Sequence, residues 1–392
     1  MVEVKAVWNG WSCMQNRIRV AWFASAFVGR SASGTAQTAR KIVEYVLLNE
    51  SKRINLILIV KNDYEISLIN NDKILSRASL ILLPKVKGKF LKSSRQFYKY
   101  VLGNNSEDID ILHFSVARLY PFYWKFPAKK FFCTFHAGGE FSVPQEKFIL
   151  SRLLYNLIAK VQWKKLDRVF ADSEFGLLEI EKFYRIPRVK IDTIFLGSDH
   201  LWNLNPVEIH LNSSKTNLVI IGRWQHYKNI HSILQAFLNL DKHTAEKFHI
   251  YLVGKQNLPG KLEIQKIVSQ IPSKQLTLFN YLEDAQLKYL YKSANLVVHP
   301  SINEGFGLPA FEAFGEGAPI AVHNGLPADY YLSSQSGVYV VNMEDIDSIT
   351  TLLKNSVNFQ RSNEDERRNF LIKSHMTWEK MCKQYVLAYL EG

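Results

Sequence analysis

Cysteine is scarce in this chain of 392 residues, and long apolar runs are absent. The 3 cysteines, Cys13, Cys133 and Cys382, are far apart, which argues against a disulfide framework or a zinc site and favours reduced thiols. No apolar stretch approaches the roughly 20 residues that span a bilayer, so no transmembrane helix is expected. The start of the chain lacks a basic segment followed by a long apolar core, so no secretory signal is expected either. These observations predict a cytoplasmic protein.

Acidic residues are few relative to basic ones, because 36 Asp and Glu stand against 49 Lys and Arg, a net charge of +13. Residues 1–200 hold 31 basic and 18 acidic residues, whereas residues 201–392 hold 18 of each. An anionic partner is therefore expected to meet the first half. Residues 85–100 interleave Lys and Arg with Phe90, Leu91, Phe97 and Tyr98, which suits an anionic membrane surface or a solvated helix face equally well. No RNA-binding signature accompanies this segment, so no nucleic-acid partner is expected.

The length and a hydrophobic content of 47% suit two globular domains. Short apolar runs alternate with helical patterns along the chain, which predicts an α/β fold with parallel sheets. Residues 200–216 show no clear period and are interpreted as a linker. The expected domains are 1–204, joined by a terminal helix over 376–392, and 212–375. Strands are expected at 20–24, 54–60, 78–83, 109–114, 130–135, 168–171, 191–196, 218–221, 248–253, 276–279, 296–299 and 320–323.

Residues 304–319, EGFGLPAFEAFGEGAP, place two carboxylates around a Gly-rich turn after the strand expected at 296–299. Gly305 and Gly307 can adopt backbone angles closed to other residues and let the main chain approach a ligand. Pro309 suits the first turn of a helix, whose free N–H groups and positive dipole end would face that turn. The turn therefore suits a diphosphate, and Glu304 and Glu312 could accept hydrogen bonds from sugar hydroxyls. The alternative is an ordinary strand-turn-helix unit with two solvated glutamates.

Two further strand ends carry candidate site residues. Arg223 follows Gly222 after the strand at 218–221, and Lys228 stands five residues later. Arg can bind a diphosphate through a fork of hydrogen bonds and Lys as a point charge, although both would be unremarkable as surface charges. His136 follows the strand at 130–135, at the end where a parallel sheet binds ligands, although a lone His is more often structural.

The segment from Glu304 to Glu312 resembles the Glu-x7-Glu signature of retaining glycosyltransferases of family 4. Gly222-Arg223 with Lys228, His136 at a strand end and a terminal helix with Trp378 extend the resemblance over most of the chain. Glu-Gly-Phe-Gly-Leu-Pro is similar to mannosyltransferases of bacterial surface-polysaccharide assembly. The sequence departs from the family at Ala137 and Ala328, where many relatives have acidic residues, and in the glycine-poor loop before Gly34.

The resemblance implies the GT-B fold, with two Rossmann-like domains facing across a cleft and a C-terminal helix that returns to the first domain. It implies catalytic roles for Glu304, His136, Arg223 and Lys228. The donor-binding residues that it implies are Gly34, Gly222, Arg223, Lys228, Gly254, Tyr281, Leu282, Glu304, Gly305, Phe306, Gly307, Leu308 and Glu312.

The implied reaction is transfer of a hexose, with mannose from GDP-mannose as the first choice, to a glycan or a polyprenyl-diphosphate-linked acceptor. Neither a metal nor another cofactor is expected. A UDP-sugar is the alternative donor. A catalytically silent partner subunit is a further alternative, because the sequence departs from the family at Ala137 and Ala328. A sugar-nucleotide epimerase is another, because these enzymes share the fold, although the Glu-x7-Glu turn is not their usual mark. The protein would work in the cytoplasm, with the inner membrane face as a place of peripheral attachment.

Overall fold

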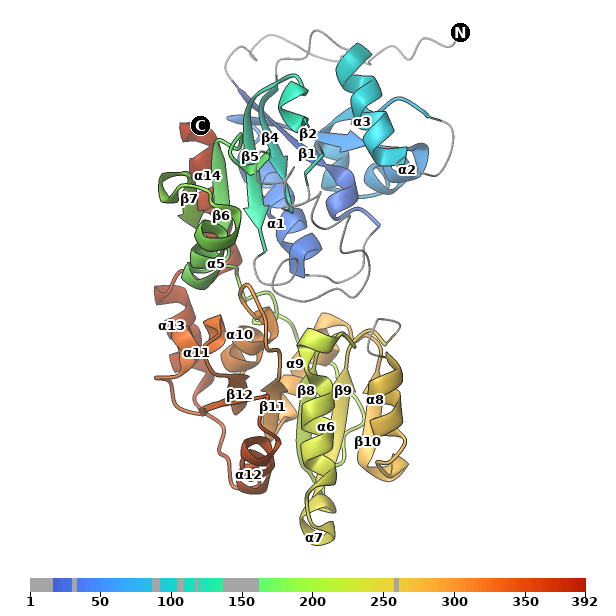
Figure 1. Ribbon diagram of the computed structural model, residues 1–392, viewed down its shortest axis with the longest axis vertical. Coiled ribbons are helices and arrows are strands. Elements are labelled where there is room, and N and C mark those ends of the chain that lie inside the picture. Colours follow the sequence, from blue (N-terminus) through green and yellow to red (C-terminus); the bar gives the residue numbers. More distant parts are fainter. Residues whose placement is uncertain are drawn as a thin grey trace. The chain divides into compact units, whose positions relative to one another are not determined.

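The computed structural model describes residues 17–29, 34–86, 92–103, 109–116, 119–120, 122–136, 162–256 and 261–392. These residues form two parallel sheets, which confirms the expected α/β fold (Figure 1). The first sheet has 7 strands in the order β3-β2-β1-β4-β5-β6-β7, and the second has 6 in the order β10-β9-β8-β11-β12-β13. The sequence also predicts an amphipathic helix over 147–165, and most of that segment lies outside the described residues, as do residues 30–33 of the polar loop before Gly34.

The elements follow the expected order closely. The strands are β1 (Ile18–Phe23), β2 (Ile54–Val60), β3 (Ser79–Leu82), β4 (Ile109–Phe114), β5 (Ala128–Phe135), β6 (Arg168–Ala171), β7 (Ile191–Thr193), β8 (Thr216–Ile221), β9 (Phe248–Val253), β10 (Leu276–Phe279), β11 (Leu296–His299), β12 (Ile320–His323) and β13 (Val338–Val341). The helices are α1 (Gly34–Asn49), α2 (Asp63–Asn70), α3 (Lys92–Gly103), α5 (Glu174–Glu179), α6 (Ile230–Leu238), α7 (Lys242–Ala245), α8 (Lys261–Val268), α9 (Asp284–Ser293), α10 (Leu308–Gly315), α11 (Pro327–Leu332), α12 (Ile346–Ser356), α13 (Glu364–Lys373) and α14 (Trp378–Glu391).

Strand β1 lies between β2 and β4, with Val20 opposite Leu56 on one side and Ile111 on the other. All three side chains are buried. A strand covered on both faces needs apolar residues at successive positions rather than at alternate ones. This explains why β2 reads INLILIV with little alternation.

Strand β8 has the corresponding place in the second sheet, between β9 and β11. Helices α6, α8 and α12 supply the side chains that bury one face of this sheet, and α6 lies across it in Figure 1. Leu218 and Ile220 of β8 share this core with Ile233 of α6 and Leu353 of α12. The carboxyl ends of the strands, where parallel sheets bind ligands, carry the candidate site.

The chain divides into two compact units. One takes the described residues up to Cys133 together with Lys165–Arg168 and Cys382–Gly392, and the other takes the described residues of Thr134–Lys164 and Val169–Met381. Helix α14 therefore has most of its length in the unit that contains β1 to β4. Tyr389 Oη of this helix lies 2.7 Å from His113 Nδ1 on β4, which confirms the returning C-terminal helix. The domain boundaries expected at 204 and 212 stay a prediction.

Helix α3 corrects part of the expectation for the basic segment. Phe97 is fully buried and stacks on Tyr120 and Phe126, with ring centroids 4.5 and 5.3 Å away, so it cannot face a membrane. Lys92, Arg95 and Lys99 are exposed on this helix. Phe97 is therefore part of the hydrophobic core, and the three cations form the exposed face of the helix. None of the helices in the described part of the chain combines the length and the apolar character that a membrane span needs.

Candidate active site

The loops after β8 and β9 approach each other so closely that only glycine fits. A Cβ added to Gly254 would lie 1.9 Å from the carbonyl oxygen of Gly222. Gly222 donates its N–H to Val253, and Gly254 donates to Phe279, so the ladder continues to the very ends of the strands. These two predicted donor-binding glycines therefore hold the backbone at the carboxyl edge of the second sheet.

The turn after β11 leads into α10 as the sequence predicts. Gly307 adopts φ +87° at the N-cap, and no side chain caps the helix. Of the two glycines that could adopt such angles, Gly307 does so and Gly305 is not among the described glycines with positive φ. The Phe306 ring stacks on Phe311 at 4.2 Å, and Leu308 is also buried. The Phe306 and Leu308 side chains therefore belong to the core, and the backbone N–H groups of this turn are the atoms that can bind a ligand.

Glu304 and Lys228 come together at this edge. Lys228 Nζ donates a hydrogen bond to Glu304 Oε1, and His299 Nε2 lies 3.3 Å from the same oxygen. Burial alone would raise the pKa of the Glu304 carboxyl, but the Lys228 ammonium and the His299 imidazole hold that pKa well below its ordinary value. Glu304 is therefore a fixed anion beside a cation, at the edge of the sheet where parallel strands bind ligands.

Glu312 lies inside α10 and is almost fully buried. Tyr291 donates its hydroxyl to Glu312 Oε2 at 3.0 Å, and His200 Nε2 lies 3.6 Å from Oε1. Burial raises the pKa of the Glu312 carboxyl, while His200 and Tyr291 partly offset that effect. Sequence reasoning did not find His200 and Tyr291. No local motif marks either of them, because each reaches Glu312 only through the tertiary fold.

His136 has a partner that the sequence did not reveal. Its Nδ1 lies 2.7 Å from Oδ2 of Asp172, which follows β6 and is 2% exposed. The next residue, Ser173, caps α5 by accepting a hydrogen bond from Gly176 N–H, and serine is one of the residue types that N-cap positions favour. Ser173 Oγ also donates to the carbonyl oxygen of Gly305 at 2.6 Å. The ends of β5 and β6 thereby connect to the Gly-rich turn that follows Glu304.

The remaining predicted residues lie apart from these contacts. Arg223 is exposed, and its side chain has no hydrogen-bond or ion-pair partner among the described residues. Tyr281 is 53% exposed after β10, whereas its neighbour Leu282 is buried. Gly34 begins α1 in the other compact unit, with open space where a Cβ would be. The structure thus pairs Lys228 with Glu304. The donor-binding roles of Arg223, Tyr281, Leu282 and Gly34 stay predictions.

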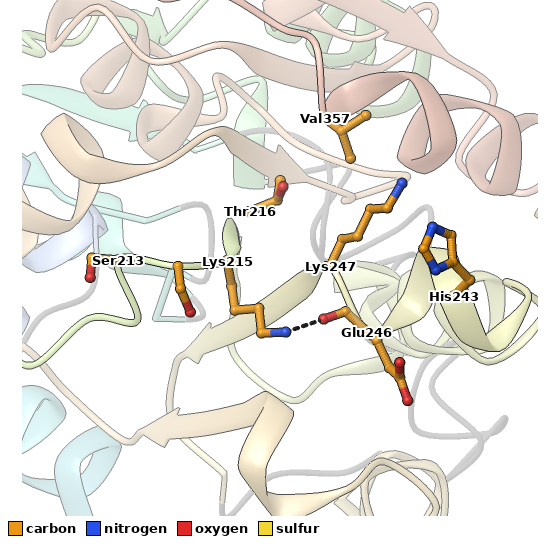
Figure 2. Close-up of a pocket in the computed structure, with 8 residues that line it drawn as sticks. Ser213, Lys215, Thr216, His243, Glu246, Lys247 and Val357 are labelled. Carbon is orange, nitrogen blue, oxygen red and sulfur yellow. Dashed lines mark hydrogen bonds between the residues drawn. The ribbon is translucent and has the colours of Figure 1, made fainter.

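A pocket of about 520 Å³ lies at the opposite edge of the second sheet, where its strands begin. It is lined by residues next to the start of β8 and β9, among them Lys215, Thr216 and Lys247 (Figure 2). Lys215 Nζ donates to the carbonyl oxygen of Glu246 at 2.6 Å, and most of the lining side chains are exposed. Ligands of parallel sheets bind at the carboxyl ends, so we do not place the active site here.

Among the described residues, no group of three or more His, Cys, Asp and Glu side chains is arranged to hold a metal ion. The expectation that the reaction needs no metal and no other cofactor stays a prediction.

Known proteins resemble this chain in sequence and in fold. Residues 205–371 match the family model of glycosyl transferases group 1. O-antigen chain mannosyltransferase B of Escherichia coli is 27% identical over 270 residues, which cover 65% of this chain and 69% of that protein. O-antigen chain mannosyltransferase RfbU of Salmonella typhimurium is 26% identical over 209 residues, 53% of this chain and 55% of that protein. Sucrose-phosphate synthase of Thermosynechococcus elongatus shares the fold, with a TM-score of 0.72 and 17% identity over 96% of this chain and 99% of that one.

Proposed function

We propose that this glycosyltransferase, which contains a group 1 domain, transfers mannose from GDP-mannose during the assembly of a surface polysaccharide. The names of two relatives support mannose and a polysaccharide product. The acceptor in this proposal is a glycan or a polyprenyl-diphosphate-linked glycan. The observation that carries the proposal is the Lys228–Glu304 pair beside the uncapped start of α10.

The donor lies along the carboxyl edge of the second sheet in this proposal. Arg223, Lys228 and the N–H groups at the start of α10 stabilise the charge that develops on the leaving diphosphate, without a metal. Glu304 contacts the sugar, and Glu312 accepts hydrogen bonds from the ribose hydroxyls once the nucleotide is bound. Tyr281 and Leu282 lie after β10, where their backbone contacts the base.

The reaction proceeds with retention of anomeric configuration. The bond between the anomeric carbon and the phosphate oxygen breaks through an oxocarbenium-like transition state. The acceptor oxygen bonds to the same face of that carbon, and its proton passes to the departing phosphate. No protein nucleophile is needed, and His136 lies beside the transferred sugar. Its hydrogen bond to Asp172 supports this role, because the bond fixes the orientation of the ring.

Thermal unfolding with GDP, UDP, ADP, TDP and their sugar conjugates tests donor binding. We expect GDP and GDP-mannose to raise the unfolding temperature of the wild type and not that of Glu312→Ala. A shift with UDP and UDP-sugars instead would name the alternative donor. No shift with any nucleotide would contradict the proposal and favour a catalytically silent partner subunit. A nucleotide shift without transfer to any acceptor would leave an epimerase to be assayed directly.

We also propose that the protein works in the cytoplasm and attaches to the inner membrane face through the basic first unit. The exposed Lys92, Arg95 and Lys99 on α3 support this part of the proposal. A lipid-linked acceptor lies in the same surface, so attachment would raise its local concentration.

A further inference from the structure

A small cavity at the carboxyl ends of β11 and β12 contains polar groups that the proposed function does not use. Its polar wall is formed by His299, Ser301, Glu304 and His323, and apolar side chains such as Phe306 complete it. Glu304 is the carboxylate assigned above to the donor sugar. The cavity, about 10 Å³, has room for one water-sized group. It therefore borders the position of that sugar, and a single hydroxyl of the sugar can enter it.

The backbone fixes the tautomer of His323. Met343 donates its N–H to His323 Nδ1 at 3.0 Å, and a backbone N–H cannot accept a hydrogen bond. Nδ1 must therefore carry a lone pair, which places the ring proton on Nε2. Burial also lowers the pKa of the His323 imidazole, although Glu344 and Asp329 partly offset this effect, so the neutral ring is favoured. No described residue accepts a hydrogen bond from Nε2–H, so His323 offers a fixed donor.

Two other polar groups of the cavity are buried without partners. His299 is 3% exposed and Ser301 is fully buried, yet neither His299 Nδ1 nor Ser301 Oγ has a hydrogen-bond partner among the described residues. Buried polar groups are nearly always paired, and an unpaired one destabilises the folded protein. A hydroxyl of a bound molecule that enters the cavity would satisfy them. Ionised Glu304 opposes a second anion, so a neutral sugar fits better than a uronic acid.

We propose that His323 is a specificity-determining residue for the donor sugar, donating its Nε2–H to one hydroxyl of a neutral hexose. Glu304 accepts a hydrogen bond from the same sugar, and His299 and Ser301 complete the polar wall. This inference rests on the proposed function and adds which side chain distinguishes the hexose. A donor that lacks the bonded hydroxyl leaves Nε2–H unpaired, so it binds less tightly.

Two substitutions separate the role of His323 in the fold from its role in recognition. In His323→Asn, the side-chain oxygen takes the place of Nδ1 and still accepts from Met343 N–H, but the donor at Nε2 is lost. In His323→Gln, the amide nitrogen reaches the place of Nε2 and keeps the donor. Asn324→Ala is the matched control, because Asn324 is exposed beside His323 and does not line the cavity. We expect His323→Asn to unfold within a few degrees of the wild type.

The measurement is the dissociation constant of GDP and of GDP-mannose for each protein, by calorimetry. We expect GDP to bind all four proteins equally. The advantage of GDP-mannose over GDP should fall about tenfold in His323→Asn and be largely kept in His323→Gln and Asn324→Ala. Among 2-, 3-, 4- and 6-deoxy analogues, one should bind the wild type about tenfold more weakly than GDP-mannose, and His323→Asn should not distinguish that analogue from the parent.

Other outcomes would overturn the proposal in distinguishable ways. An unchanged advantage of GDP-mannose in His323→Asn, with normal GDP binding, would refute the role of His323 and leave the proposed function intact. If GDP does not bind the wild type, the same comparison is made with UDP, UDP-glucose and its deoxy analogues. Failure of both nucleotides to bind would refute the proposed function and this inference with it.

Discussion

At the scale of single residues, the site depends on charges held away from water. Glu304 has a side chain only 16% exposed and keeps its charge because Lys228 and His299 face it. Breaking a buried pair costs about 3–5 kcal/mol, because one charge is then left without its partner. A substitution that removes only one of the two partners is therefore expected to destabilise the loop.

The low pKa of Glu304 predicts a dependence of stability on pH. A carboxyl whose pKa is depressed in the folded state stabilises the fold above its unfolded value of about 4.3, and this contribution is lost as the pH falls. We expect the free energy of unfolding to fall more steeply below about pH 5 for the wild type than for Glu304→Gln, by about 2 kcal/mol. Urea titrations at several pH values measure this difference. Parallel curves for the two proteins would show that Glu304 does not contribute.

A second prediction concerns Asp172, which we regard as a positioning residue for His136. Asp172→Asn keeps the size of the side chain but removes the carboxylate that orients the ring. We expect kcat to fall roughly tenfold or more, with the dissociation constant of the donor nucleotide unchanged. The double variant His136→Gln with Asp172→Asn should lose no more than His136→Gln alone. Independent, additive losses would mean that Asp172 acts on something other than His136.

At the scale of elements, close contacts between loops decide where substitutions are tolerated. We expect Gly254→Ala to destabilise the protein by about 2 kcal/mol or more, because its Cβ would overlap the Gly222 carbonyl. Gly103→Ala is the matched control, since nothing lies within 4 Å of a Cβ at the end of α3. Chemical denaturation measures both. Equal stability of the two variants would show that the loops after β8 and β9 move apart at little cost.

Most elements could be predicted from the sequence because each carries a local signal. The strands at 54–60, 248–253 and 320–323 have the expected bounds, since their apolar runs stop at polar or glycine residues. Ser173 caps α5 and Gly307 precedes α10, as their residue types predict. Local chemistry was sufficient for these features.

The contacts of the site were less predictable. The Lys228–Glu304 pair joins residues 76 positions apart, and the His136–Asp172 pair joins residues 36 apart. Family resemblance supplied three of these four residues, but no pattern in the sequence indicated Asp172 or showed which atoms meet. The partners of Glu312 were missed for the same reason. Phe97 was misinterpreted because a buried aromatic residue within a basic helix looks the same in sequence as an exposed one.

At the scale of the whole molecule, the charge asymmetry predicts how the protein meets a membrane. We expect it to sediment with vesicles that contain anionic phospholipid and not with neutral vesicles, and to be released by salt. Lys92→Glu, Arg95→Glu and Lys99→Glu together should abolish this binding. The matched control is Lys242→Glu, Lys247→Glu and Lys274→Glu, three exposed residues of the neutral half. Equal sedimentation with both kinds of vesicle would contradict electrostatic attachment.

The return of α14 to the first unit also has a consequence during synthesis on the ribosome. His113 and its partner Tyr389 are 276 residues apart, so at about 5–20 residues per second roughly 15 to 55 s separate their translation. Throughout that interval the surface around Trp22, His113 and Phe132 lacks the helix that later buries it. The unit made first is therefore completed last, and a nascent chain needs protection at this apolar surface until Tyr389 has been made.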